Sequence, residues 1–349
     1  MLKKSKKSEN NQSFFRVGFL EAIRNNWNEE VKQLILENET GINNNTLLMD
    51  ASRLGNLEIL KFSIERGADI NYKMGNQTAL IEASAGGHLE IVKYLVENGA
   101  EDINNALMSA SASGHLETVK YLIENGANIN ITNHLTDRTI LMTAVRNGNL
   151  EVVQYLIECG ADVNAKSRSG EIALIIASIR GYCEIVKCLA ENGANDINDA
   201  LIEASKSGKL GAVKCLAEHG ADIDYKDNNG KTALMSALEN EKLRIVAYFI
   251  ERCGDINAKY DYEYYISEGI EETEYDKENI FGKYKGMTIL MIASLLGKLE
   301  TVKYLIKNGA DVNIENYKCD TALDLTEKAY IDKEIKDEII KALKEAGAI

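Results

Sequence analysis

Four histidines and six cysteines are the side chains of this 349-residue chain best suited to nucleophilic, acid–base or metal chemistry. The cysteines have neither the density of a disulfide framework nor the C-x-x-C spacing of a zinc site, so we expect reduced thiols. Cys183 and Cys188 are five residues apart on one expected helix and point about 140° apart, so they do not converge. No glycine-rich phosphate-binding loop is present. The sequence therefore predicts a protein that is not an enzyme and holds no metal or cofactor.

Composition and charge restrict the class of partner. The formal net charge of −14 disfavours capture of a nucleic-acid backbone, which needs clustered lysine and arginine. No apolar run is long enough to cross a membrane, and residues 1–8 are basic without the apolar core of a secretory signal. We expect a soluble, cytoplasmic monomer whose partner is a protein with a basic or neutral surface, with no nucleic acid and no membrane.

The elements that would position any site are set by an internal repeat. A glycine-centred motif of the form Gly-Ala-x-Ile/Val-Asn recurs along the chain, at 67–71, 99–104, 126–130, 160–164, 193–198, 220–224, 254–257 and 309–313. Periods of 20–50 residues are typical of stacked helical repeats. The chain therefore reads as an elongated array of small units that share one continuous core.

Each unit is predicted to contain two helices. The second helix precedes the glycine motif, as in 87–98, where Ile91, Val92 and Leu95 form one apolar stripe. The first helix is shorter and rich in small residues, as in 78–87. A threonine in front of it can cap its free amides, and the glycine after the second helix can adopt the left-handed conformation of a C-cap.

These residues resemble the ankyrin-repeat family, whose motif reads G-x-TPLH-x-AA-x-x-GH-x-x-VV-x-LLL-x-x-GAD-x-N. The resemblance covers residues 14–349 and implies an all-α solenoid of stacked helix-turn-helix pairs with short β-hairpin fingers. It also implies structural roles for His88 and His115 in the turns between helices. The chain departs from the family in having no proline. It also has Ile or Met where the family has His, which predicts an apolar ladder in the core at Met49, Ile81, Met108, Met142, Ile175, Ile202, Met235 and Met291.

The repeat divides the chain into a basic disordered tail, two capping segments, the repeats and one insert. The expected boundaries are 1–13 for the tail, 14–44 for the N-terminal capping helix pair, 45–257 for the repeats, 258–286 for the insert, 287–317 for a further repeat and 318–349 for the C-terminal capping repeat. The short units 105–130 and 199–224 leave no room for a finger. They correspond after a shift of 94 residues, which indicates tandem duplication. Trp27 is expected to pack in the N-terminal cap.

The insert at 258–286 stands where a finger normally turns back, and it contains six tyrosines and eight acidic residues. Two interpretations remain open. It is a passive extended loop kept in solution by its charges, or it is a projecting binding element, since tyrosine is enriched in binding surfaces. Nearby, Ile292, Leu295 and Leu296 occupy positions that face the concave groove in the ankyrin pattern and are usually polar. Either the insert covers them or they form an exposed apolar patch. Ile176 and Ile179 repeat the pattern where no insert can shield them.

Two functional hypotheses follow. The first is a scaffold that binds a partner protein through the groove, the finger tips and the insert. The second is an inhibitor or regulator whose acidic insert occludes a basic cleft, which predicts strongly salt-dependent binding. The resemblance also leaves delivery into a host cell open. The partner-binding residues that the resemblance implies are Tyr72, Lys73, Met74, His134, Leu135, Arg138, Arg168, Ile176, Ile179, Tyr225, Lys226, Asp227, Ile292 and Leu295, to which the insert adds Tyr260, Tyr262, Tyr264, Tyr265 and Tyr275.

Overall fold

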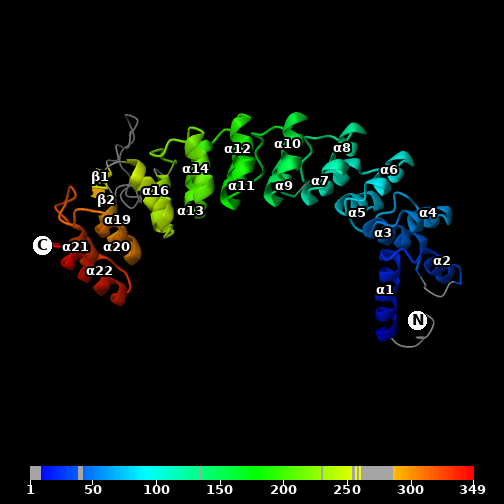
Figure 1. Cartoon of the computed structure of the whole chain (residues 1–349), viewed down its shortest axis with the longest axis horizontal. Coiled ribbons are helices and arrows are strands. Elements are labelled where there is room, and N and C mark those ends of the chain that lie inside the picture. Colours follow the sequence, from blue (N-terminus) through cyan, green and yellow to red (C-terminus); the bar gives the residue numbers. More distant parts are fainter. Residues whose placement is uncertain are drawn as a thin grey trace, which may run out of the picture. The chain divides into compact units, whose positions relative to one another are not determined.

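The computed structural model describes residues 9–37, 42–133, 135–228, 231–253, 256–257, 259–260 and 286–349. The chain divides into two compact units, Met1–Ile176 and Ala177–Ile349, which are described separately. In each unit, pairs of antiparallel helices follow one another along the chain (Figure 1). A first helix packs on the first helix of the next pair, and second helices pack in the same way.

Unit 1 contains the first helices α3, α5, α7 and α9 in one row and the second helices α4, α6, α8 and α10 in another. The pair α1 and α2 precedes both rows. The bounds are α1 (Glu9–Arg24), α2 (Asn28–Leu36), α3 (Asn44–Leu54), α4 (Leu57–Glu65), α5 (Ala79–Ala85), α6 (Leu89–Glu97), α7 (Ile103–Ser113), α8 (Leu116–Glu124), α9 (Ile140–Asn147) and α10 (Leu150–Glu158). Helix α11 (Ala173–Arg180) runs across the division between the units.

Unit 2 continues the pattern and includes one short antiparallel strand pair. Its helices are α12 (Cys183–Glu191), α13 (Ile197–Lys206), α14 (Leu210–Glu218), α15 (Ala233–Glu239), α16 (Leu243–Cys253), α19 (Ile289–Leu295), α20 (Leu299–Lys307), α21 (Ala322–Lys328) and α22 (Lys333–Glu345). Strands β1 (Lys259–Tyr260) and β2 (Met287–Thr288) pair Lys259 with Thr288 and Tyr260 with Met287. They form the base of the finger that precedes α19.

Local sequence signals account for the helix ends. The Thr78 hydroxyl accepts a hydrogen bond from the Ile81 amide at 3.3 Å, and Thr139 caps α9 in the same way through Met142. At the end of α3, Gly55 has φ +82°, and a Cβ there would stand 2.6 Å from Cε1 of His88. Glycine is therefore needed at position 55 both for the backbone conformation and for close stacking of the next pair.

The core is apolar at the position where the family motif has histidine, and the expected ladder is confirmed at most of its positions. Met49, Ile81, Met142, Ile202, Met235 and Met291 are buried, whereas Met108 and Ile175 are half-buried. Larger side chains complete the core, among them Phe19 and Ile23 in the N-terminal pair and Phe249 in α16. Burial of side chains of this size stabilises a fold by about 1.5–3 kcal/mol each.

Two expectations for the N-terminal region are wrong. Helix α1 begins at Glu9, inside the range 1–13 that was expected to be disordered. Trp27 was expected to pack in the cap, but its side chain is 51% exposed. Phe19 and Ile23 of α1 are instead the fully buried large side chains of this pair. Trp27 stands in the turn that follows Asn26, whose φ of +57° directs the chain into α2.

Candidate protein-binding surface

Three hairpin loops of unit 1 project in front of the first helices, and they are called here the first finger (72–77), the second finger (131–138) and the third finger (165–171). In the first finger, Met74 and Gln77 exchange backbone hydrogen bonds of 3.0 and 3.2 Å, which closes the turn. Tyr72 is half-buried, while Lys73 is exposed and pairs with Asp102 at 2.7 Å. Met74 is 54% exposed at the tip. The first finger therefore presents one apolar side chain and one ion-paired lysine.

The second and third fingers are joined by two ion pairs. Nη2 of Arg138 lies 2.7 Å from Oε2 of Glu171, and Nε of Arg168 lies 3.1 Å from Oδ2 of Asp137. The backbone amide of Arg168 also donates to the carbonyl of Thr136 at 3.0 Å. Arg138 and Arg168, both expected to contact a partner, thus hold the two fingers together. Hydrogen bonding by Arg138 lowers the pKa of the Glu171 carboxyl.

Leu135 projects from the second finger with 81% of its surface exposed. Because the neighbouring ion pairs fix the finger, this apolar side chain is held at a defined place in solvent. His134, the adjacent predicted contact, lies outside the described residues. Ordering a loop before binding lowers the entropy lost on association, so a fixed finger is well suited to recognition.

No finger stands between the first and second fingers at the start of α7. Helix α6 ends at Glu97 and α7 begins at Ile103, and the chain turns between them through Asp102, whose φ is +62°. Asn105, in the first turn of α7, is exposed. The same arrangement occurs in unit 2, where Asp196 has φ +57° in front of α13.

In unit 2, the predicted contacts Tyr225, Lys226 and Asp227 lie between α14 and α15. Tyr225 is half-buried and lies near the carboxyls of Asp199 and Asp227. Burial, and then the nearby charges of Asp199 and Asp227, raise the pKa of Tyr225. Lys226 is exposed. Oδ1 of Asp227 accepts a hydrogen bond from the Lys231 amide at 2.8 Å, so this carboxylate stabilises the loop.

Two of the three isoleucines expected to lie in the groove are in the core. Ile176 is 5% exposed and Ile292 is 2% exposed, so the expected exposure of Ile176 is wrong. The residue after the ladder position is buried in some repeats even when it is polar, as Asp50 and Ser236 show, but it is half-buried in others, such as Glu82 and Thr143. Ile179 and Leu295, one helical turn further along, are half-buried and remain partly accessible.

Little of the insert falls within the described part of the chain. Tyr260 is a residue of β1, but its side chain is not among those described, and Tyr262, Tyr264, Tyr265 and Tyr275 lie outside the described residues. At the base of this finger, the ring of Tyr317 lies against Gly286 and 5.8 Å from Nζ of Lys259. Tyr317 is 58% exposed, and the sequence analysis missed it. The sequence feature that could have identified Tyr317 is the presence of an aromatic residue in the loop one repeat after the insert.

His88 and His115 serve the packing of the repeats. Nε2 of His88 lies 3.1 Å from the carbonyl oxygen of Arg53, and His115 makes the same contact with Ala85 at 3.0 Å. Each ring therefore satisfies a carbonyl at the end of the preceding first helix. Burial raises the pKa of the Cys215 thiol, which opposes formation of the nucleophilic thiolate. In the described residues, no three His, Cys, Asp or Glu side chains are grouped to hold a metal ion.

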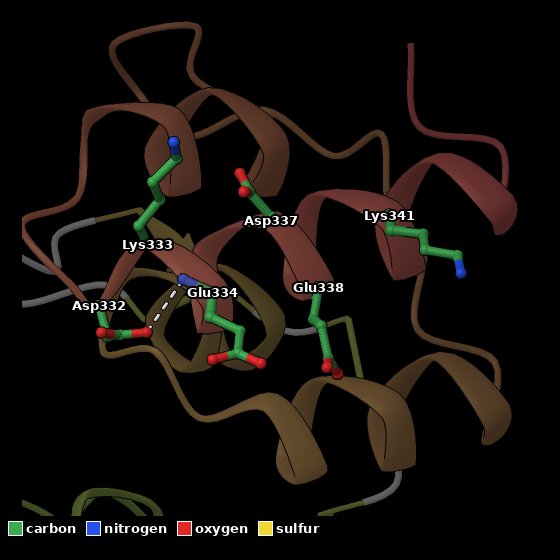
Figure 2. Close-up of a pocket in the computed structure, with 6 residues that line it drawn as sticks. All are labelled: Asp332, Lys333, Glu334, Asp337, Glu338 and Lys341. Atoms are coloured by element: carbon green, nitrogen blue, oxygen red, sulfur yellow. Dashed lines mark hydrogen bonds between the residues drawn. The ribbon is translucent and has the colours of Figure 1, made fainter.

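A surface hollow of about 520 Å³ lies along α22 (Figure 2). Its lining consists of exposed charged side chains of this helix and its N-terminal cap, Asp332, Lys333, Glu334, Asp337, Glu338 and Lys341. Oδ1 of Asp332 accepts a hydrogen bond from the Glu334 amide at 2.9 Å and so acts as a helix cap. The hollow offers no nucleophile, and we assign no chemistry to it. None of the described helices combines the length and apolarity that crossing a bilayer requires.

Comparison with known proteins agrees with this geometry. The family model for ankyrin repeats in three copies matches residues 19–106, 72–133, 107–199 and 174–260, and the model for a single ankyrin repeat matches residues 285–317. None of the curated proteins compared with the chain matches it. The crystal structure of the human ASB11 ankyrin repeat domain is similar, with 28% sequence identity and a TM-score of 0.51 over 54% of this chain and 90% of that one.

The expected fold class, stacked helix pairs of an all-α ankyrin-repeat protein, is confirmed by these matches and by the helices of both units. Repeats of this kind are generally non-enzymatic modules for protein–protein interaction. The matched models cover most of the chain, and the protein is therefore a member of the ankyrin-repeat family.

Proposed function

We propose that the chain binds a partner protein through the fingers of unit 1. The observation that carries the proposal is the exposure of Leu135 on a finger fixed by two ion pairs. A single exposed apolar side chain is common on protein surfaces. Here a second one, Met74, stands at the tip of the first finger. Two apolar tips on neighbouring loops can supply the apolar area that the centre of an interface buries.

We also propose that the protein is monomeric and cytoplasmic. Its partner is proposed to have a basic or neutral surface. The net charge of −14 supports such a partner, because complementary charge speeds encounter. The ankyrin-repeat family supports protein binding in general. It names no partner for this chain.

Affinity capture can test the proposal with three forms of the full chain. The wild type is compared with the double variant Met74→Ser, Leu135→Ser and with the control Leu36→Ser. Leu36 is 62% exposed at the end of α2 and belongs to none of the three fingers, so the control removes a similar apolar side chain elsewhere in unit 1. We expect the double variant to bind the captured partner about tenfold more weakly. Equal binding by all three forms would contradict the proposal.

The alternative function, an inhibitor that occludes a basic cleft, rests on the acidic residues of the insert. The paired strands β1 and β2 favour it, because they bring the two ends of the insert together in a hairpin base. A variant that lacks residues 261–285 tests this alternative. Loss of binding in the deletion, together with a steep decrease of affinity with salt, would favour inhibition. Binding that changes neither with the deletion nor with salt concentration would favour the fingers as the binding site.

A further inference from the structure

The tip of the second finger is closed on itself by one asparagine. Oδ1 of Asn133 accepts a hydrogen bond from the Leu135 amide at 2.9 Å. The backbone carbonyl of Asn133 accepts from the amides of Thr136 and Asp137 at 3.2 and 2.8 Å. Asp137 then turns the chain back with φ +51°. Three consecutive amides of the tip therefore already have acceptors within the finger.

The third finger completes the tip through a single residue, Arg168. Its Nη1 lies 3.3 Å from the carbonyl oxygen of Leu135. Its Nε and Nη2 lie 3.1 and 3.4 Å from the two carboxylate oxygens of Asp137. Its backbone amide donates to the carbonyl of Thr136 at 3.0 Å. The planar guanidinium can bind a carboxylate with two nitrogens while the third serves a carbonyl, which a lysine cannot do.

These contacts determine how a partner can recognise Leu135. A partner that adds a strand to a loop needs free backbone amide and carbonyl groups on that loop. Both backbone polar groups of Leu135 are already bonded, the amide to Asn133 and the carbonyl to Arg168. The side chain is 81% exposed. Recognition at Leu135 must therefore proceed through the side chain, which needs an apolar pocket on the other protein.

The border of Leu135 is polar and carries balanced charge. The side chains of Arg168 and Asp137 are 64% and 43% exposed, and they neutralise each other. A pocket with a strongly charged rim would have to compete with this ion pair. A pocket with a neutral rim fits the surface better.

We infer that Arg168 is a positioning residue for partner binding. It holds Leu135 as a rigid apolar knob that enters an apolar pocket of the partner protein, sized for one leucine side chain. The inference rests on the proposed function and specifies the chemistry of the partner at Leu135. Arg168 acts through Leu135, because a side chain that is fixed before association loses less entropy when it is bound.

Nuclear magnetic resonance relaxation of the full, isotope-labelled chain tests the positioning without any partner. The order parameter of the Leu135 amide should be about 0.85 in the wild type and should fall below about 0.6 in Arg168→Gln. The matched control is Arg53→Gln in α3, since Arg53 is also about half exposed and pairs with a carboxylate, Asp50, at 3.0 Å. The control should leave the Leu135 amide rigid. An equally rigid Leu135 in Arg168→Gln would overturn the inference.

A binding probe comes from a displayed library of one small folded domain with a randomised concave face. The library is selected on the wild-type chain in the presence of excess Leu135→Ser chain as competitor. The affinity of one selected domain should fall about five- to tenfold in Arg168→Gln. Arg53→Gln should bind it as the wild type does.

A double-mutant cycle separates positioning from direct contact. In the background Leu135→Ala, the further change Arg168→Gln should alter the affinity for the selected domain by less than about twofold. In the background Met74→Ala, the same change should keep its full effect. If the effect of Arg168→Gln persists undiminished in Leu135→Ala, Arg168 contacts the domain directly and the positioning role is wrong.

The size of the side chain at position 135 tests the pocket. Because Leu135 is exposed, its replacement leaves the fold intact. Leu135→Met should bind the selected domain within about threefold of the wild type, since the two side chains are similar in volume. Leu135→Trp keeps the apolar character but exceeds a pocket of leucine size, so binding should be lost. Unchanged binding by Leu135→Trp would indicate a flat apolar contact and contradict the pocket.

Selection of no domain would also overturn the inference. The proposed function is judged separately, by capture of a partner with the Met74→Ser, Leu135→Ser variant. Capture that depends on Met74 and Leu135 but is the same in Arg168→Gln would leave the proposed function standing and remove only the positioning role. Capture that is indifferent to Met74 and Leu135 would remove the proposed function itself, whatever the selected domains show.

Discussion

The ring of Tyr317 lies so close to Gly286 that a Cβ on Gly286 would stand 2.5 Å from Cδ2 of Tyr317. Gly286 also has φ +73°, a backbone conformation that costs other residues about 1–2 kcal/mol. The contact joins the base of the finger that precedes α19 to the loop that precedes α21. It therefore ties two successive repeats of unit 2 together beside the insert.

Replacement of Gly286 by Ala should destabilise the protein by about 2–3 kcal/mol, because overpacking against the ring adds to the backbone cost. The control is Gly75→Ala in the first finger, where φ is +64° and the added Cβ would meet nothing within 4 Å. The control should lose only the backbone part. Denaturant unfolding followed by circular dichroism measures both, and equal losses would show that the contact with Tyr317 is unimportant.

Ser111→Ala should stabilise the protein by about 1 kcal/mol. The Ser111 hydroxyl is buried and has no hydrogen-bond partner among the described residues, and alanine also favours the helix. The matched control is Ser52→Ala at the same repeat position, where the hydroxyl donates to the Leu48 carbonyl at 2.7 Å. Thermal unfolding should rank Ser111→Ala above Ser52→Ala. A reversed order would contradict this account of the serine positions.

Cys319→Gly should stabilise the protein by about 0.5–1 kcal/mol, because Cys319 has φ +61° and glycine adopts this conformation without strain. The control is Cys159→Gly, since Cys159 is also an exposed free cysteine but has φ −79°. That control should lose stability through the greater freedom of the unfolded chain. If both changes have the same sign, the backbone of Cys319 is not strained.

The ion pair between Arg138 and Glu171 should stabilise the second and third fingers above acidic pH. The pKa of Glu171 is lowered by Arg138, so its contribution to folding is present above its ordinary pKa of 4.5 and is lost as the pH falls below that value. The pair is partly exposed, so its contribution should be under about 1 kcal/mol. The stability difference between wild type and Glu171→Gln should therefore shrink on acidification. A difference that stays constant or grows would contradict the role of the pair.

The repeat pattern was enough to predict the helix pairs, the threonine caps and most of the apolar ladder, because these depend on neighbours within a few residues. The ion pairs of Arg138 and Arg168 were missed, since each joins residues more than thirty positions apart. Their partners depend on how one finger lies beside the next. Sequence spacing does not determine that arrangement.

The error at Ile176 has a different cause. The family pattern assigned its position to the groove, whereas in α11 this side chain is packed into the core. The same position is half-buried in other repeats, as at Glu82 and Thr143, so its burial differs from repeat to repeat. Trp27 shows the reverse case, in which an aromatic residue is half exposed while Phe19 and Ile23 of the same pair are buried. Burial at the edges of a repeat depends on packing with the neighbouring repeat, which a motif read in isolation does not describe.

Hydrogen–deuterium exchange of the full chain, with and without the captured partner, tests partner binding by the fingers most directly. Binding at this surface should slow exchange in the first finger and the second finger. Helix α22, which is not part of this surface, should exchange as before. Protection confined to the second helices or to α22, with the two fingers unchanged, would contradict the proposed site.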